Sequence, residues 1–186
     1  MGTLPSFLNR VVAAFVVFVW SIPATAQDWA KVDELLEMLQ TEELPNWQMV
    51  EEEIWTEWSK SGSPSADFLL QRGRKALEAG DLAAAIDHLT AVLDHVPDFA
   101  EGYNLRASAY FQSGLFGPSM ADIQQVLIRN PNHFGALAGL GTIMSELERN
   151  EAALRAFRMA AAIHPHDPDL KTWIERLEAK VSGTTL

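Results

Sequence analysis

Apolar side chains recur every three or four residues along most of the chain, with polar residues between them. One stretch, for example, carries Leu82, Ile86, Leu89 and Leu93. This spacing places the apolar side chains on one face of an α-helix and leaves the other face polar. The pattern therefore predicts a series of amphipathic helices, each of which buries one face against its neighbours.

Three prolines, Pro97, Pro131 and Pro165, divide this helical pattern at intervals of 34 residues. Proline lacks a backbone N–H and restricts the residue before it, so each of the three ends a helical run. Alignment of the chain on these prolines predicts three units of two helices each, 66–99, 100–133 and 134–167.

Residues that favour helix ends set the expected boundaries inside the units. Ser65 is expected to cap a helix over 66–79, and Asp81 is expected to cap the helix that follows. In the third unit a helix is expected from Asn132 or His133 to about Arg149, with His133 in contact with solvent.

Each unit carries small residues where its two helices would approach closely and large residues between them. The marked positions are Gly73, Gly80, Ala85, Leu89, Val92, Pro97, Tyr103, Ala107, Tyr110, Gly114, Ile123, Val126, Pro131, Leu137, Gly141, Ala153, Phe157, Ala160 and Pro165. This pattern resembles the tetratricopeptide repeat (TPR) family, in particular its short bacterial exported members, although Ala76, Met144 and Ser119 depart from it. The resemblance implies an all-α fold, a right-handed α-solenoid of antiparallel helix pairs.

The segments on either side of the repeats also read as helical. Residues 27–63 are interpreted as an N-terminal helical pair, either a degenerate repeat or a cap, with Trp55 and Trp58 packed on the first repeat. The tryptophans can instead form a binding patch, because Trp is enriched at binding hot spots. A capping helix is expected over 168–181, with Asp167 as its N-cap, followed by a tail at 182–186.

Residues 1–26 have the features of a secretory signal peptide. Arg10 precedes ten consecutive apolar residues, Val11 to Trp20, and Ala24-Thr25-Ala26 forms a small-residue cleavage site. The apolar run is shorter than the ~20 residues of a transmembrane helix. We expect a periplasmic or secreted protein cleaved after Ala26, and contact with a membrane only if this segment is retained.

Composition narrows the possible functions. The chain has 186 residues, 48% of them hydrophobic and 21% charged, which is ordinary for a globular domain. Its net charge of −11 argues against a nucleic-acid partner, because phosphate backbones repel an acidic protein. The absence of cysteine excludes disulfides and thiol chemistry.

Motifs for catalysis are missing from the sequence: it has no glycine-rich phosphate loop, GxSxG elbow or HExxH motif. His164 and His166 flank a proline turn and are not expected to bind a metal. The acidic run Glu51–Glu53 is interpreted as a solvated helical face. We therefore expect no enzyme, no cofactor and no metal.

The family resemblance implies a concave groove, lined by the first helix of each unit, that binds a protein or peptide. Arg74 and Asn104 are placed to hold a peptide backbone or a carboxylate, but the cluster with which some family members clamp a C-terminal carboxylate is not reproduced. The groove residues of the third unit are small, so they should deepen the floor of the groove. Alternatively these residues cover the core, or the C-terminal helix fills the groove. The expected groove residues are Leu70, Arg74, Leu77, Asn104, Ser108, Phe111, Gly135, Ala138 and Thr142.

Together these features predict an exported protein-binding adaptor or assembly scaffold. The alternatives are a membrane-tethered accessory subunit of an envelope enzyme or secretion complex, and an enzyme whose site the sequence does not reveal.

Overall fold

The computed structural model describes residues 26–183, so the predicted signal peptide apart from Ala26, and residues 184–186 of the tail, lie outside the described residues. Residues 26–183 form nine α-helices, with one isolated bridge between Ala26 and Ser61. None of these helices combines the length and the apolar character needed to cross a membrane. The helices are α1 (Trp29–Leu39), α2 (Trp47–Trp58), α3 (Pro64–Glu78), α4 (Leu82–His95), α5 (Ala100–Gln112), α6 (Phe116–Arg129), α7 (Phe134–Glu146), α8 (Asn150–Ile163) and α9 (Pro168–Gly183).

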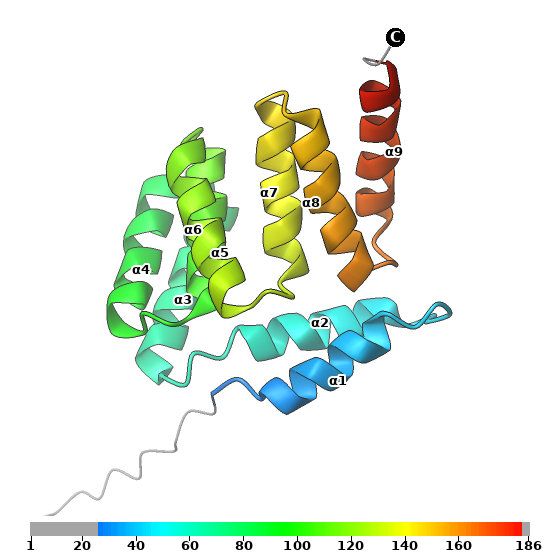
Figure 1. The fold of residues 1–186 in the computed structure, drawn as a ribbon. Coiled ribbons are helices and arrows are strands. Elements are labelled where there is room, and N and C mark those ends of the chain that lie inside the picture. Colours follow the sequence, from blue (N-terminus) through cyan, green and yellow to red (C-terminus); the bar gives the residue numbers. More distant parts are fainter. Residues whose placement is uncertain (1–25, 184–186) are drawn as a thin grey trace, which may run out of the picture.

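Helices α3 to α8 form three antiparallel pairs that stack side by side, which confirms the predicted all-α solenoid (Figure 1). Small residues allow the two helices of a pair to approach. A Cβ atom on Gly73 would lie 2.7 Å from Cγ of Leu89, and one on Gly141 would lie 2.9 Å from the ring of Phe157. A Cβ atom at these distances would push the facing side chain away, so glycine suits the crossings of the first and third pairs.

The first repeat begins earlier than the sequence indicated. Helix α3 starts at Pro64, and Ser63 is its N-cap in place of the expected Ser65, with its side chain accepting a hydrogen bond from the N–H of Ala66. Proline suits the first helical position, because the N–H it lacks would have no partner there. Asp81 caps α4, as predicted.

Helix α7 is shorter than the sequence indicated, since it ends at Glu146 and not near Arg149. The turn that follows places Glu148 at φ 57°, where the two other repeats have glycine, Gly80 and Gly114, at φ 75° and 73°. A positive φ reverses the chain at a helix C-terminus, so Glu148 adopts the turn conformation that glycine normally provides.

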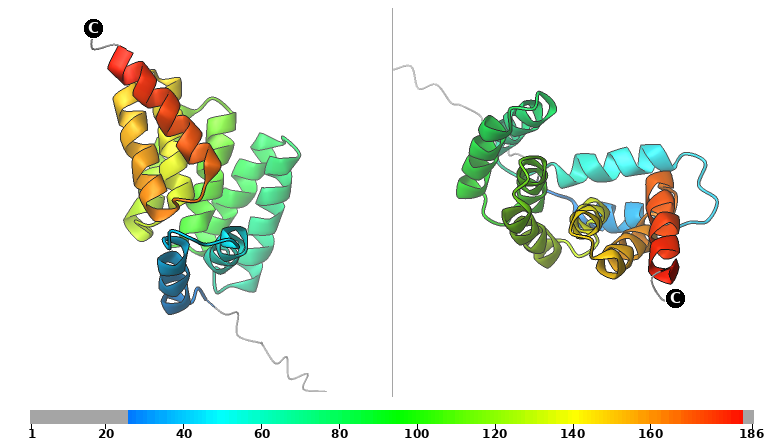
Figure 2. Two further views of the ribbon diagram at one scale, coloured as in Figure 1. Left: turned by 90° about the vertical axis from the view of Figure 1, so that its right-hand side faces the viewer. Right: turned by 90° about the horizontal axis from the view of Figure 1, so that it is seen from above.

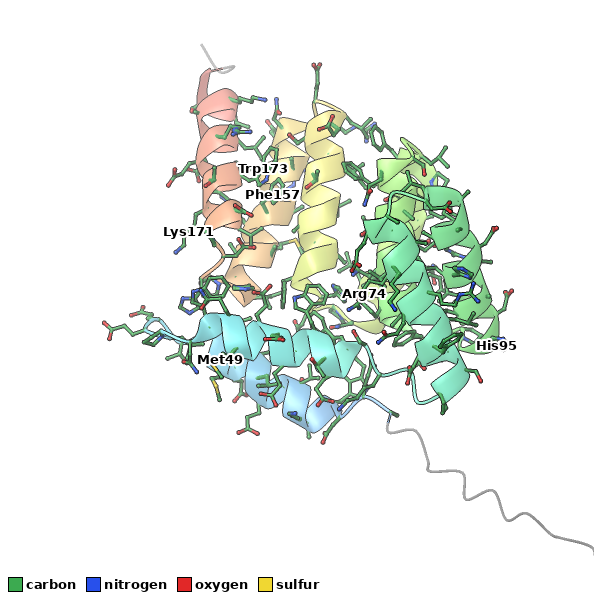
Figure 3. All side chains as sticks on the ribbon, turned by 180° about the vertical axis from the view of Figure 1, so that it is seen from behind. Met49, Arg74, His95, Phe157, Lys171 and Trp173 are labelled. Atoms are coloured by element: carbon green, nitrogen blue, oxygen red, sulfur yellow. The ribbon has the colours of Figure 1, made fainter. Side chains whose placement is uncertain are left out.

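Helix α9 stacks on α8 and closes the C-terminal end of the solenoid. The apolar face predicted for it is confirmed, because Leu170 and Leu177 are buried. The ring of Trp173 stacks on that of Phe157, with centroids 5.4 Å apart, between the two helices (Figure 3). The helix continues to Gly183, two residues beyond the predicted end.

The N-terminal hairpin, α1 and α2, is not stacked in line with the repeats. It lies across one end of the repeat helices, below α5 to α8 in Figure 1, and the left view of Figure 2 shows it at the same end. The turns at this end connect one repeat with the next. The hairpin therefore contacts parts of the chain that are far from it in sequence.

Aromatic contacts hold the hairpin on the turn between α6 and α7. Trp58, only 1% exposed, stacks on His133 with ring centroids 4.4 Å apart, and its ring also lies 5.1 Å from that of Phe134. The expected packing of Trp55 and Trp58 on the first repeat is therefore wrong, because both contact the start of the third. The expected solvent contact of His133 is also wrong: its side chain is 0% exposed.

A second set of contacts joins the hairpin to the turn between α8 and α9. The ring of Trp47 meets that of His164 edge to face, with centroids 5.2 Å apart, and Oε2 of Glu51 lies 3.5 Å from Nε2 of His164. The Nε2 atom of His166 lies 2.8 Å from the carbonyl oxygen of Thr41. The hairpin thus spans two successive turns of the solenoid.

Charged groups join α1 to α2. Glu57 is buried, and its carboxylate accepts hydrogen bonds from Lys60 at 2.7 Å and from Lys31 at 2.9 Å. The hydrogen bond from Lys60 lowers the pKa of Glu57, burial opposes this, and Lys31 adds to the lowering. The carboxylate therefore stays ionised although it is buried.

Arg106 of α5 joins the first and second repeats. Its guanidinium donates two hydrogen bonds to Asp122 of α6, at 2.7 and 2.9 Å, and one to Thr90 of α4 at 3.2 Å. The bidentate pair with Asp122 raises the pKa of Arg106. One side chain thus links three helices across this junction.

Candidate functional site

A cleft of about 230 Å³ lies between α5 and α7, on the side formed by the first helices of the repeats. Gly139 of α7 leaves this space open, since a Cβ atom there would meet only Ile123, at 3.7 Å. The floor is mostly apolar and the rim carries uncharged polar groups. The lining residues are Asn104, Ala107, Ser108, Phe111, Gln112, Ser119, Ile123, Gly135, Ala136, Gly139, Thr142 and Ile143.

Five of the nine residues expected to line the groove lie around this cleft: Asn104, Ser108, Phe111, Gly135 and Thr142. Two others, Leu70 and Arg74, line a separate polar cleft of about 440 Å³ between α2 and α3. The last two, Leu77 and Ala138, are partly buried against the cores of their own helix pairs.

The small residues of the third unit are expected to deepen the floor, but the space directly beside one of them, Gly135, is not open. The edge of the Trp55 ring from α2 fills that space, 2.6 Å from where a Cβ atom on Gly135 would lie. The open space lies beside Gly139, one helical turn further on, which sequence reasoning did not name. The four-residue spacing of the two glycines was the available signal, because it places both on one helix face.

Arg74 and Asn104, expected to hold a ligand, both bind an internal carboxylate. Glu101 is only 2% exposed, and it accepts hydrogen bonds from Arg74 at 3.2 Å and from the side-chain amide of Asn104 at 3.0 Å. Arg74 also donates to the hydroxyl of Ser59 at 3.1 Å, and it lies on the inner side of α3 (Figure 3). Each of these two side chains therefore already has an internal hydrogen-bond partner.

His133 completes this buried network. Its Nδ1 accepts a hydrogen bond from the backbone N–H of Ala136 at 3.1 Å and so caps α7. An acceptor nitrogen carries no proton, so the proton of the neutral ring lies on Nε2, 3.3 Å from Oε2 of Glu101. Sequence reasoning missed this network, because its side chains come from two helices, α3 and α5, and from the turns at Ser59 and His133.

The binding patch considered for the tryptophans is not available at Trp58, which is buried. Trp55 packs against His133 and Phe134, with ring centroids 5.4 and 5.2 Å apart. Both tryptophans thus hold the hairpin on the repeats. Residues 26–183 contain no group of three or more His, Cys, Asp or Glu side chains that could hold a metal ion.

A second apolar cleft, of about 310 Å³, lies along α6. Ile123 lines both clefts, and Met120, Ile128 and Leu140 line only this one. The junction between the second and third repeats is therefore hollowed on both sides of a single side chain. No side chain comparable to Arg106 is placed there in the part of the chain that the structure describes.

Stacked helix pairs with an inner cleft define the class of helical-repeat solenoids that bind other proteins. A family model described as tetratricopeptide repeat matches residues 70–117. A TPR repeat-containing protein of Rhizobium etli is 34% identical over 161 residues, which cover 86% of this chain and 79% of the relative. The chain belongs to the tetratricopeptide repeat family.

Other similarities are more partial. The SGT1 homologue of Bos taurus is 31% identical over 120 residues, 64% of this chain, which span only 36% of that protein. Among solved structures, the first TPR of Spaghetti (RPAP3), bound to the HSP90 peptide SRMEEVD, superposes with a TM-score of 0.62 at 22% identity. It covers 64% of this chain, and the match spans 95% of the domain. At this identity the similarity shows a shared fold.

Proposed function

We propose that this protein is an adaptor that holds a segment of another protein in the cleft between α5 and α7. The observation that carries the proposal is the open apolar space beside Gly139, in the groove that the repeat architecture forms. The solved relative named above holds a peptide, which supports a peptide-sized ligand here as well.

The size and lining of the cleft suit one bulky apolar side chain of a partner. Full burial of a side chain such as Leu or Phe contributes about 1.5–3 kcal/mol, so one anchor gives weak binding by itself. The polar rim, including Asn104 and Ser108, can add hydrogen bonds to the backbone of the bound segment. The expected complex is therefore one anchor residue with polar contacts on either side.

Filling the cleft tests this proposal. Gly139→Leu places a side chain in the open space, whereas Gly117→Leu adds the same side chain at an exposed site where a Cβ atom would meet nothing within 4 Å. In affinity purification from the native host, the unmodified protein and Gly117→Leu should recover the same partner, and Gly139→Leu should lose it. Equal recovery by all three would contradict binding in this cleft.

We also propose that the protein is exported. The support is the sequence of residues 1–26: a basic residue, a short apolar run and a small-residue cleavage site. Mass spectrometry of the protein from its host should find Gln27 as the first residue. An intact N-terminus in a membrane fraction would instead favour the membrane-tethered accessory subunit, and an intact N-terminus in the cytoplasm would contradict both.

A further inference from the structure

The hydroxyl groups around the cleft between α5 and α7 donate hydrogen bonds to backbone carbonyl groups of the protein itself. Ser108 donates to the carbonyl of Asn104 at 3.2 Å, and Thr142 donates to the carbonyl of Ala138 at 3.1 Å. Ser119 donates across to the carbonyl of Ala107 at 2.7 Å. A hydroxyl has one proton and two lone pairs, so in this arrangement each of the three presents lone pairs to a ligand and accepts a hydrogen bond from it.

The side-chain amide of Asn104 is partly used as well. Its nitrogen donates one of its two protons to Glu101, 3.0 Å away, which leaves the amide oxygen and one N–H for a ligand. Of the polar lining residues, Gln112 alone has no hydrogen bond that fixes its direction. The rim of the cleft therefore presents mainly acceptors, and a ligand must bring the donors.

The charges around the cleft also favour a ligand that carries hydrogen-bond donors, namely a cationic one. Within residues 26–183 no charged side chain lines it, and the nearby cation of Arg74 is paired with Glu101. The chain as a whole has a net charge of −11. An anionic segment would thus meet acceptors and an overall negative field, whereas a cationic segment is attracted by both.

We propose that the cleft selects a basic segment of a partner protein, in which a bulky apolar residue is flanked by lysine or arginine. This specificity rests on the proposed function, since it concerns the ligand of the same cleft. The apolar residue enters the space beside Gly139, and backbone and side-chain N–H groups of the segment donate to Asn104, Ser108 and Thr142. An acidic peptide such as SRMEEVD, which the solved relative holds, is disfavoured.

Selection from a library of short peptides tests the proposal. Each peptide carries a central Leu or Phe, an acetylated N-terminus and an amidated C-terminus, and all other positions are randomised. Peptides bound by the unmodified protein but not by Gly139→Leu should be enriched in Lys and Arg over Asp and Glu. Individual basic peptides should bind about tenfold more tightly than their acidic counterparts, with a preference that weakens as salt increases.

Two variants change the charge beside the cleft in opposite directions. Glu101→Gln leaves the cation of Arg74 unpaired while its side-chain oxygen can still accept from His133, so the preference for basic peptides should shrink and SRMEEVD should bind better. Arg74→Gln leaves the carboxylate of Glu101 without its cation, so the preference should grow. Thermal unfolding of each variant checks that it is folded, and either variant alone is sufficient for the test.

The outcomes separate the two proposals. Enrichment of acidic peptides, or of none of the charged residues, among peptides that Gly139→Leu fails to bind would overturn the basic specificity and leave the binding function standing. The absence of any peptide that distinguishes the unmodified protein from Gly139→Leu would overturn the binding function, and the specificity with it.

Discussion

The two segments that flank the repeats pack against them in different ways. At the C-terminus, α9 stacks on α8 as one more helix, with Leu170 and Leu177 buried in the seam. At the N-terminus, the hairpin lies across the ends of the repeats and is held by aromatic contacts with His133 and His164. The first arrangement follows from a periodic apolar face. The second depends on residues in turns, which follow no period.

The largest expected effect comes from removing the main anchor of the hairpin. Trp58→Ala empties a site that is 1% exposed and should lower the free energy of unfolding by about 4 kcal/mol. Urea denaturation measures this. Because the ring stacks on His133, hydrogen exchange should also become faster in the distant turn between α6 and α7. Trp29→Ala, at a site 45% exposed, should change stability by less than about 0.5 kcal/mol.

The equivalent change at the C-terminal end should be smaller and more local. Leu177→Ala removes a fully buried side chain of α9 and should cost about 3 kcal/mol. Since α9 contacts its neighbour in the stack, the faster exchange should be confined to α8 and α9. Faster exchange in α3 or α4 would show that the C-terminal end is not the local cap described here.

Gly135 and Gly139 lie on the same helix, α7, but Gly135 faces the hairpin and Gly139 faces the open cleft. Gly135→Ala would place a Cβ atom 2.6 Å from the Trp55 ring and should cost about 1–3 kcal/mol, as overpacked sites do. Gly139→Ala adds the same group in open space and should raise stability by about 0.5–1 kcal/mol, because alanine is favoured over glycine inside a helix. Equal costs, measured by urea denaturation, would mean that the ring is not seated on Gly135.

The smallest expected effect is a change in the free energy of unfolding at acidic pH. The pKa of Glu57 is lowered in the folded protein, so its contribution to stability is complete above the ordinary carboxyl pKa of about 4.3 and is lost as pH falls through the lowered value. The stability difference between the unmodified protein and Glu57→Gln should therefore shrink as pH drops below that range. A difference that is constant with pH would show that the two lysines do not stabilise the ionised carboxylate.

Most of the fold could be predicted because stacked repeats require similar residues at regular intervals in the sequence. The interval between Pro97, Pro131 and Pro165 located the repeats, and Gly73 and Gly141 marked the close crossings. The apolar face of α9 identified the capping helix before its contacts were known.

The position of the hairpin and the chemistry of the cleft could not be predicted in the same way. His133 occupies a turn position that Phe99 and Asp167 occupy in the neighbouring units, so the repeat gave no indication that it is buried. Its partner Glu101 is 32 residues away. A first-turn glutamate normally interacts with solvent and the helix dipole, and only the folded chain brings Arg74, Asn104 and His133 to it.

A solenoid bends at the junctions between its repeats, because each repeat contacts only its neighbours. In this protein we expect the junction hollowed on both sides of Ile123 to bend most easily, and the hairpin crosses beneath it. The hairpin is linked to α3 by the hydrogen bond from Arg74 to Ser59 and to α7 by the contact of Trp55 with Gly135, so bending at that junction should strain one of these two contacts. We therefore expect the width of the partner cleft to depend on how firmly the hairpin is seated.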